Sequence, residues 1–270
     1  MATRTYGRPA ILQERVTHYC PGCGHGIVHR LLAEIITERD LRSRTIGLMP
    51  VGCAVIGYDY LDIDVCEAAH GRTPAVATGI KRALPDRLVF TYQGDGDLAA
   101  IGTAEIIHAA NRGENISVIF INNAVYGMTS GQMAPTTLVG QKTATTPAGR
   151  NPDNEGCPIR VCELLASLER SAYLERTSLF SPRHVRHTKR AIEHAFETQL
   201  ERRGFSLVEV LSPCPTYWRM TPCKAMQHIE NVMTRTFPLG VIKDWTQGSG
   251  DASRSPGQAG HVPGARETDE

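Results

Sequence analysis

Apolar and polar positions recur with two different periods in the middle of the chain, and together they predict a strand–helix–strand unit. Residues 87–93 and 116–121 are apolar, β-branched runs with the length of buried strands. Between them, residues 98–110 carry Ala and Ile at helical spacing, and Gly113 stands where a C-cap glycine belongs. The first strand runs into Gly94-Asp95-Gly96, so the pattern predicts a tight turn at the carboxyl end of a buried strand.

The same patterns extend the prediction to most of the chain. Helices are expected at residues 27–38, 160–169 and 181–202, the last with Ser181 as N-cap and Pro182 as first helical residue, and strands at 45–49 and 205–211. This order predicts an α/β fold with a mostly parallel sheet flanked by helices, in one domain over residues 1–245. Residues 131–155 lack periodicity and read as a loop beside the active site, and the polar Gly/Ser/Pro-rich residues 246–270 read as a disordered tail.

Composition and charge exclude several classes of partner. The 270 residues are 41% hydrophobic and carry a net charge of +1, which gives no reason to expect nucleic acid or a charged membrane surface. The first residues lack the apolar core of a signal peptide and no stretch is long enough to cross a bilayer, so a cytoplasmic protein is expected. The many basic residues of 181–202 are read as a solvated helix face, with a docking surface for an acidic protein as the alternative.

The Gly-Asp-Gly turn has the chemistry of a diphosphate site. Gly94 and Gly96 let the backbone approach a diphosphate, and the amino end of the next helix favours an anion. A diphosphate is usually held through Mg²⁺, which prefers hard oxygen ligands. Asp95 and Asn123 each follow a predicted parallel strand, and the carbonyl of Val125 would add a third oxygen. The plainer alternative is a strand-to-helix turn in which Asp95 caps the helix.

The cysteines indicate metal or redox chemistry. Of the eight, four lie in loops at the ends of predicted elements: Cys20, Cys23, Cys53 and Cys214. Four thiolates suit a [4Fe–4S] cluster or structural zinc, and a C-x-x-C pair alone belongs more often to zinc or a redox dithiol. Cys66 and Cys162 lie in apolar stretches and are expected in the core, whereas Cys157 and Cys223 are ambiguous.

Five motifs occur in an order that is typical of one family. They are His18-Tyr-Cys-Pro-Gly-Cys-Gly-His25, Val51-Gly-Cys-Ala54, Ala69-His-Gly-Arg72, Gly94-Asp-Gly-Asp97 and Asn122-Asn-Ala-Val-Tyr-Gly-Met128 with Gly131-Gln132. Over residues 15–235 the chain resembles the β subunit of 2-oxoacid:ferredoxin oxidoreductases, which has a thiamine diphosphate-binding fold. The surroundings of Cys53 and residues 77–82 are most similar to the 2-oxoisovalerate (branched-chain) branch.

The resemblance implies a role for each matching residue. Cys20, Cys23, Cys53 and Cys214 match the ligands of a [4Fe–4S] cluster, and Asp95, Asn123 and the Val125 carbonyl match the Mg²⁺ ligands. The diphosphate and thiazole are expected against Gly94, Gly96, Asp97, Tyr126, Gly127, Met128 and Thr129. His70 matches a catalytic residue on the active-site side, although a loop histidine that caps nearby backbone is the alternative. Tyr126 and Met128 could equally be core residues.

The resemblance also implies a reaction and its partners. The expected reaction is oxidative decarboxylation of a 2-oxo acid with coenzyme A to acyl-CoA and CO₂, with electrons passing through the cluster to ferredoxin. The glutamate that protonates the aminopyrimidine comes from the α subunit in this family, and γ and ferredoxin-like δ subunits are expected as well. The chain is therefore expected to be inactive without its partner subunit.

The substrate pocket is expected to contain Ile56 and Arg72. Family members specific for 2-oxoglutarate tend to carry Lys or Arg at the position of Ile56, so an apolar 2-oxo acid is expected here. The same chemistry on 2-oxoglutarate or pyruvate is the first alternative. Two other classes remain: a non-redox thiamine diphosphate decarboxylase or synthase with structural zinc, and a non-catalytic zinc-stabilised scaffold subunit.

Overall fold

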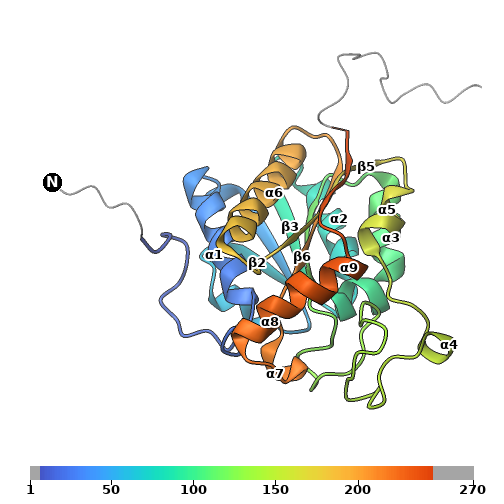
Figure 1. The fold of residues 1–270 in the computed structure, drawn as a ribbon. Coiled ribbons are helices and arrows are strands. Elements are labelled where there is room, and N and C mark those ends of the chain that lie inside the picture. Colours follow the sequence, from blue (N-terminus) through green and yellow to red (C-terminus); the bar gives the residue numbers. More distant parts are fainter. Residues whose placement is uncertain (1–6, 246–270) are drawn as a thin grey trace, which may run out of the picture.

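A seven-stranded sheet runs through the molecule, with helices packed on both of its faces (Figure 1). The computed structural model describes residues 7–245, so the predicted disordered tail lies outside the described residues. The strand order is β2-β1-β3-β4-β6-β5-β7, and all neighbours are parallel except β7, which is antiparallel to β5. The strands are β1 (Thr45–Pro50), β2 (Asp64–Ala68), β3 (Leu88–Gly94), β4 (Ser117–Asn122), β5 (Ser171–Ser178), β6 (Phe205–Leu211) and β7 (Gly240–Asp244). The predicted α/β fold is confirmed.

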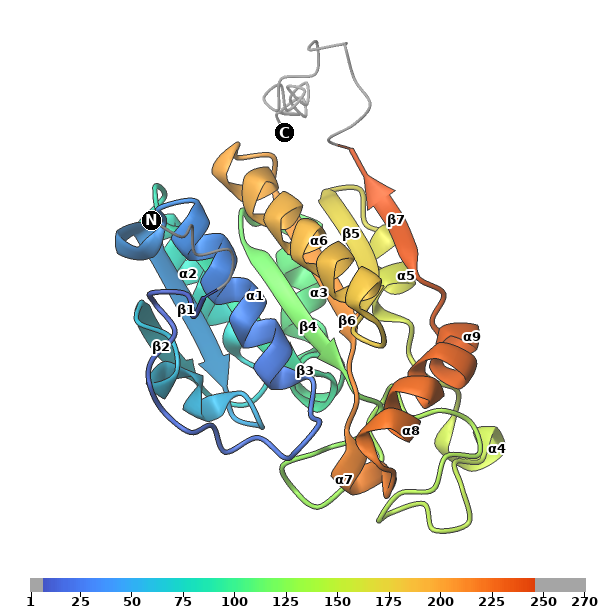
Figure 2. The same ribbon diagram turned by 60° about the vertical axis from the view of Figure 1, so that its left-hand side comes forward.

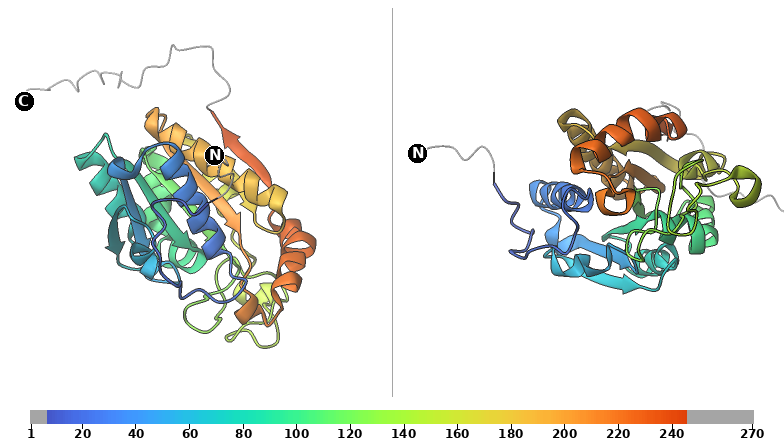
Figure 3. Two further views of the ribbon diagram at one scale, coloured as in Figure 1. Left: turned by 90° about the vertical axis from the view of Figure 1, so that its left-hand side faces the viewer. Right: turned by 60° about the horizontal axis from the view of Figure 1, so that its bottom comes forward.

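The helices divide between the two faces of the sheet. They are α1 (His25–Glu38), α2 (Thr73–Ala83), α3 (Thr103–Arg112), α4 (Pro152–Glu155), α5 (Val161–Ala166), α6 (Pro182–Leu200), α7 (Pro215–Trp218), α8 (Pro222–His228) and α9 (Thr234–Thr236). Helices α1 and α6 lie side by side over one face, and α2, α3 and α5 cover the other (Figure 2, Figure 3). Residues 7–245 contain no helix with both the length and the apolar character of a membrane span.

The central strands alternate between these two layers. On β3, Phe90 and Tyr92 pack under α1 and α6, whereas Val89 packs under α2 and α3. On β4, Ile119 faces the first layer and Phe120 the second. Because both faces are covered, every residue of β4 and β6 is buried, as is every residue of β3 except Gly94, which produces the nearly continuous apolar runs seen in the sequence.

Two predicted helices differ from the structure. Residues 98–110 are not one helix: a π-helical turn at Asp97–Ile101 precedes α3, and Gly102 joins them. The turn containing Gly71 presses against this junction, since a Cβ on Gly102 would lie 2.8 Å from the Gly71 carbonyl oxygen. The helix predicted at 160–169 ends at Ala166, where the Ser167 hydroxyl donates to the Leu164 carbonyl. Gly113 does adopt the left-handed C-cap conformation, with φ of 64°.

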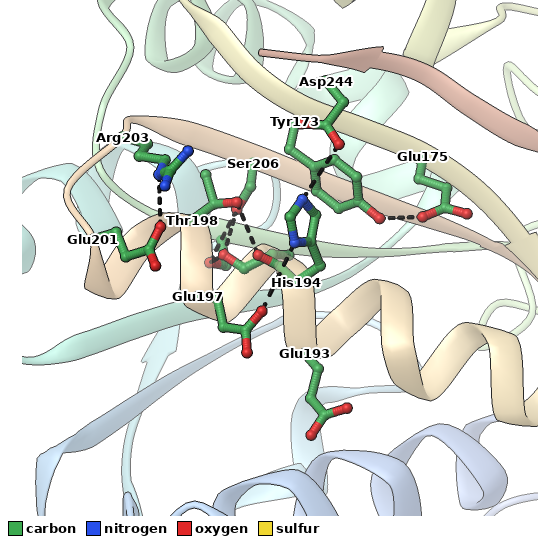
Figure 4. Close-up of polar contacts among 12 residues, drawn as sticks. Tyr173, Glu175, Glu193, His194, Glu197, Thr198, Glu201, Arg203, Ser206 and Asp244 are labelled. Atoms are coloured by element: carbon green, nitrogen blue, oxygen red, sulfur yellow. Dashed lines mark hydrogen bonds and ion pairs between the residues drawn. The ribbon is translucent and has the colours of Figure 1, made fainter. Parts of the chain in front are cut away.

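The long helix α6 begins as predicted, because Ser181 accepts a hydrogen bond from the His184 amide and Pro182 follows it. Its basic residues Arg183, Arg186 and Arg190 are exposed. The carboxyl half of α6 also holds the edge of the sheet (Figure 4). There His194 lies between Glu197 and Asp244 of β7, with Nε2 3.4 Å from Asp244 Oδ2.

Candidate functional site

A cavity of about 460 Å³ opens at the carboxyl ends of the parallel strands. The loop that precedes α4, together with α7, gathers at this end of the sheet (Figure 2). The cavity is lined by His25, Pro50, Val51, Gly52, Cys53, Ala54, His70, Gly94, Asp95, Gly96, Asp97, Asn123, Val125, Tyr126, Gly127, Met128, Thr129 and Gln132. The structure therefore brings together all the residues expected around a diphosphate, a thiazole and Mg²⁺, along with His70.

Asp95 is the centre of the polar wall of this cavity. Its side chain is only 2% exposed; Oδ1 accepts from the Gly96 amide at 2.8 Å, and Oδ2 accepts from Thr136 Oγ1 at 2.6 Å. Burial raises the pKa of Asp95 to about 7, against the lowering effect of the Thr136 hydrogen bond. A buried carboxylate is costly without a cation nearby, so this position favours one.

The neighbouring strand end supplies two further oxygens. Asn123 follows β4 and is buried, and the amide of Val125 lies 3.2 Å from Asp95 Oδ2 and 3.3 Å from Asn123 Oδ1. The Asn123 carbonyl accepts a hydrogen bond from Trp218 Nε1 of α7 at 3.0 Å. One carboxylate, one amide oxygen and one backbone carbonyl, from Val125, are a donor set that fits Mg²⁺ and leaves positions for phosphate oxygens and water.

The two glycines of the turn serve different purposes. A Cβ on Gly94 would meet no atom within 4 Å, so the backbone there is open to the cavity, as a diphosphate site requires. A Cβ on Gly96 would lie 2.0 Å from the Tyr126 ring. Gly96 is needed because the ring packs on it, and the Tyr126 hydroxyl also donates to its carbonyl.

His70 also lines the cavity, and its Nδ1 atom makes the contacts that hold the ring in place. This nitrogen lies 2.9 Å from the Val51 carbonyl and 3.1 Å from Asp97 Oδ1. Asp97 is buried, which raises its pKa, and it also accepts from the Gly71 amide and from Gln93 Nε2. Because both neighbours of Nδ1 are acceptors, Nδ1 carries the proton and Nε2 is left as the ring nitrogen free to act on a ligand.

A second cavity of about 180 Å³ contains the four loop cysteines. Cys20, Cys23, Cys53 and Cys214 all line it, although they come from three distant parts of the sequence. Burial raises the pKa of Cys53 and of Cys214 to about 12, so both are thiols until a metal stabilises the thiolates. Among the described residues, no three His, Cys, Asp or Glu side chains are grouped as the ligands of a single metal ion.

The other cysteines lie away from this cavity. Cys162 is buried in the core, as predicted. Cys66 is only half-buried, contrary to the prediction, because β2 is the outermost strand on its side of the sheet. Cys157 and Cys223 are exposed.

The two cavities share a wall. His25, Cys53, Asn123, Gly127 and Met128 line both of them. A Cβ on Gly127 would lie 3.1 Å from Cys53 Sγ and 3.8 Å from Cys214 Sγ, so the backbone passes between these thiols. His25 is 3% exposed and its Nδ1 lies 2.8 Å from the Tyr92 hydroxyl; burial lowers its pKa to about 3.

Two expected pocket residues do not line the first cavity. Ile56 lies in the 3₁₀ turn Val55–Asp59, beyond Ala54, and Arg72 precedes α2 and forms an ion pair with Glu105. Their place in a substrate pocket stays a prediction. Sequence reasoning missed Thr136, which contacts Asp95, and Trp218, which contacts Asn123. Both contacts span long sequence separations, so no local pattern indicates them.

Comparison with known proteins gives the chain its relatives. Residues 51–210 match the model of the thiamine pyrophosphate enzyme C-terminal TPP-binding domain. The ketoisovalerate oxidoreductase subunit VorA of Methanothermobacter thermautotrophicus is 51% identical over 228 residues, which are 84% of this chain and 48% of VorA. The 2-oxoglutarate synthase subunit KorB of Archaeoglobus fulgidus is 36% identical over 219 residues, 81% of this chain and 78% of KorB. The chain thus spans about half the length of the VorA relatives.

Among solved structures, the 2-oxoglutarate:ferredoxin oxidoreductase of Magnetococcus marinus is similar in fold. The TM-score is 0.70 at 24% sequence identity, with 89% of this chain and 86% of that chain covered.

Proposed function

Since the chain belongs to the 2-oxoacid:ferredoxin oxidoreductase family, as a thiamine pyrophosphate-binding subunit, we propose that it carries the catalytic centre for oxidative decarboxylation of a 2-oxo acid. The products are acyl-CoA, formed with coenzyme A, and CO₂, and the electrons pass to ferredoxin. The observation that carries this proposal is the wall shared by an oxygen-lined cavity and a cavity lined by four cysteines.

In the first cavity, Asp95, Asn123 and the Val125 carbonyl would hold Mg²⁺, and the open backbone at Gly94 would face the diphosphate. When bound, thiamine diphosphate supplies the electron sink that makes decarboxylation of a 2-oxo acid possible. The chain's own residues orient and shield this chemistry. His70 would present Nε2 to the substrate, because its Nδ1 is already held by the Val51 carbonyl and Asp97.

In the second cavity, Cys20, Cys23, Cys53 and Cys214 would hold a [4Fe–4S] cluster, which accepts electrons one at a time. The presence of all four cysteines in the lining of one cavity of about 180 Å³, beside the first cavity, supports a redox cluster over structural zinc. A non-redox thiamine diphosphate enzyme or a zinc-stabilised scaffold leaves unexplained why this space adjoins the first cavity.

The substrate we propose is 2-oxoisovalerate or a related apolar 2-oxo acid. Among the described residues that line the first cavity there is no Lys or Arg, and Val51, Ala54 and Met128 give it an apolar wall. A branched alkyl group gains about 0.8 kcal/mol per methylene from burial, whereas the distal carboxylate of 2-oxoglutarate would lack a cation. The 51% identity to a ketoisovalerate oxidoreductase subunit supports the same choice.

Catalysis needs a partner subunit in this proposal. The described lining of the first cavity contains Asp95 and Asp97 but no glutamate, so the group that protonates the aminopyrimidine would come from an α subunit. We further propose γ and ferredoxin-like δ subunits and a cytoplasmic location. Nothing in the charge of the chain favours nucleic acid as a partner.

The proposal is tested on the complex purified without oxygen through a tag on this chain. We expect a visible absorption that dithionite bleaches, since zinc and magnesium are colourless. Cys214→Ala should contain about four fewer iron atoms per chain than the wild-type complex and should lose the reduction of acceptor, because it removes one ligand of the cluster. Cys66→Ala is the control and should keep both. A Cys214→Ala variant with full iron and activity would show that the ligands are assigned wrongly.

A further inference from the structure

In the loop that follows β4, the side-chain hydroxyl of Thr136 contacts Asp95, the carboxylate of the proposed metal site. Thr136 is fully buried and does not line the cavity, yet its Oγ1 lies 2.6 Å from Asp95 Oδ2, 41 residues away in the sequence. It contacts the carboxylate from the protein side. A threonine hydroxyl beside a carboxylate can only donate, so Thr136 fixes one oxygen of Asp95.

The hydrogen bonds of Asp95 are unequal between its two oxygens. Oδ2 accepts from Thr136 Oγ1 at 2.6 Å and from the Val125 amide at 3.2 Å, whereas Oδ1 accepts from the Gly96 amide at 2.8 Å. A carboxylate oxygen has about two acceptor positions, so Oδ2 is filled and Oδ1 has one position left. Asp95 therefore offers a cation one oxygen and not two.

The position of Thr136 is itself fixed by a buried arginine. Arg150 is 4% exposed, and its Nη1 donates to the carbonyls of Pro135 at 2.9 Å and Thr137 at 2.6 Å, the two residues that flank Thr136. The same guanidinium donates to the carbonyls of Glu155, Gly156 and Cys157. Both ends of the loop are thereby tied to one side chain, and the hydroxyl cannot withdraw without breaking several bonds.

We propose that Thr136 is a positioning residue that makes the metal subsite selective for Mg²⁺. Mg²⁺ requires near-octahedral geometry with single oxygens, whereas Ca²⁺ accepts bidentate carboxylates and irregular geometry. By occupying Oδ2, Thr136 keeps Asp95 monodentate, which suits Mg²⁺ and penalises Ca²⁺. This inference rests on the proposed function, because it takes Asp95 to be a ligand of the ion that holds thiamine diphosphate.

The test measures thiamine diphosphate binding by calorimetry, with either Mg²⁺ or Ca²⁺, in the complex freed of metal and cofactor. Thr136→Val keeps the shape but removes the donor. We expect it to weaken Mg²⁺-supported binding about tenfold or more, as for a lost hydrogen bond to a charged group, and Ca²⁺-supported binding much less. Thr136→Ser should restore the preference for Mg²⁺.

Thr188→Val is the matched control, because Thr188 of α6 is equally buried and its hydroxyl donates to the carbonyl of Ser178, the last residue of β5. It should leave the preference between the two ions unchanged. Should Thr136→Val fail to fold, as judged by circular dichroism, Thr136→Ala is compared with Thr136→Ser in its place. An unchanged ratio of Mg²⁺- to Ca²⁺-supported binding in the donor-free variant overturns the inference alone. No binding by the wild type with either ion overturns the proposed function and the inference with it.

Discussion

Some residues of the candidate site can be predicted from the local sequence, whereas others are recognised only in the folded structure. Asp95 and Asn123 each follow a buried strand, and the chemistry of a diphosphate site explains both, so the sequence predicts them. Thr136 contacts Asp95 across 41 residues, and Trp218 contacts Asn123 across 95. No local pattern encodes such a contact, because it depends on where two distant loops end.

Burial of the charged Lys81 side chain lowers the stability of the folded protein. It lies near the end of α2, 7% exposed, where its ammonium donates to the Arg87 carbonyl. Burial lowers its pKa to about 8, with Arg202 and Arg44 acting in the same direction and Asp86 against them. The unfolded chain, with a lysine pKa of 10.5, therefore binds a proton more readily than the folded protein.

The first prediction concerns this lysine. Since the unfolded state binds more protons between pH 8 and 10.5, Lys81 makes the free energy of unfolding rise with pH over that window, by about 3 kcal/mol. Lys81→Met should lack this rise and be about 1–3 kcal/mol more stable at pH 7, allowing for the lost hydrogen bond. Chemical denaturation at pH 7 and pH 10.5 measures it. The exposed Lys224→Met is the control, and equal stabilities of Lys81→Met and wild type at pH 7 would refute the argument.

Whole elements are predicted well where apolar residues predominate along them. Strand β6 is found at the predicted residues, and β1, β3 and β4 within one residue at each end. Strand β5 was missed although all its residues are buried, because Glu175 and Arg176 interrupt the apolar pattern. Arg176 is tolerated there since it pairs with Glu209 of β6, and both side chains are fully buried. The two residues of this buried ion pair come from different strands, so the sequence pattern of either strand alone does not predict the pair.

The loop that precedes α5 is the element on which the second prediction rests. Arg150→Met keeps the length of the side chain but leaves several buried carbonyls without a donor. We expect the protein to lose about 2–4 kcal/mol of stability and hydrogen exchange to become faster in residues 131–157. Arg183→Met, on the exposed face of α6, is the control and should change neither. Unaltered exchange in the loop of Arg150→Met would mean that the guanidinium does not organise it.

At the scale of the molecule, the periodic pattern predicts the parallel sheet, and the sheet predicts that the site lies at its carboxyl edge. Both are confirmed. The antiparallel edge strand β7 was not predicted, since Gly240–Asp244 is short and half-exposed and is held by contacts with β5 and α6.

The third prediction belongs to the assembled complex. Its kcat/KM should be higher for 2-oxoisovalerate than for 2-oxoglutarate, because the described lining of the first cavity carries no cation to pair with a second carboxylate. Burial of each methylene of the branched side chain should raise kcat/KM about fourfold, because it stabilises the bound state by about 0.8 kcal/mol. Steady-state kinetics with both acids decides the matter. A clear preference for 2-oxoglutarate would mean that a partner subunit supplies the cation.

The wall shared by the two cavities limits how such a protein can evolve or be engineered. A substitution at Gly127 or Met128 made to reshape the substrate side also alters the surroundings of the cysteines, because the same residues face both spaces. Effects of such substitutions should be strongly non-additive. Val51 and Gln132 line the first cavity alone. Changes in what the first cavity accepts are therefore most readily gained at these two positions, where a substitution leaves the surroundings of the four cysteines unaltered.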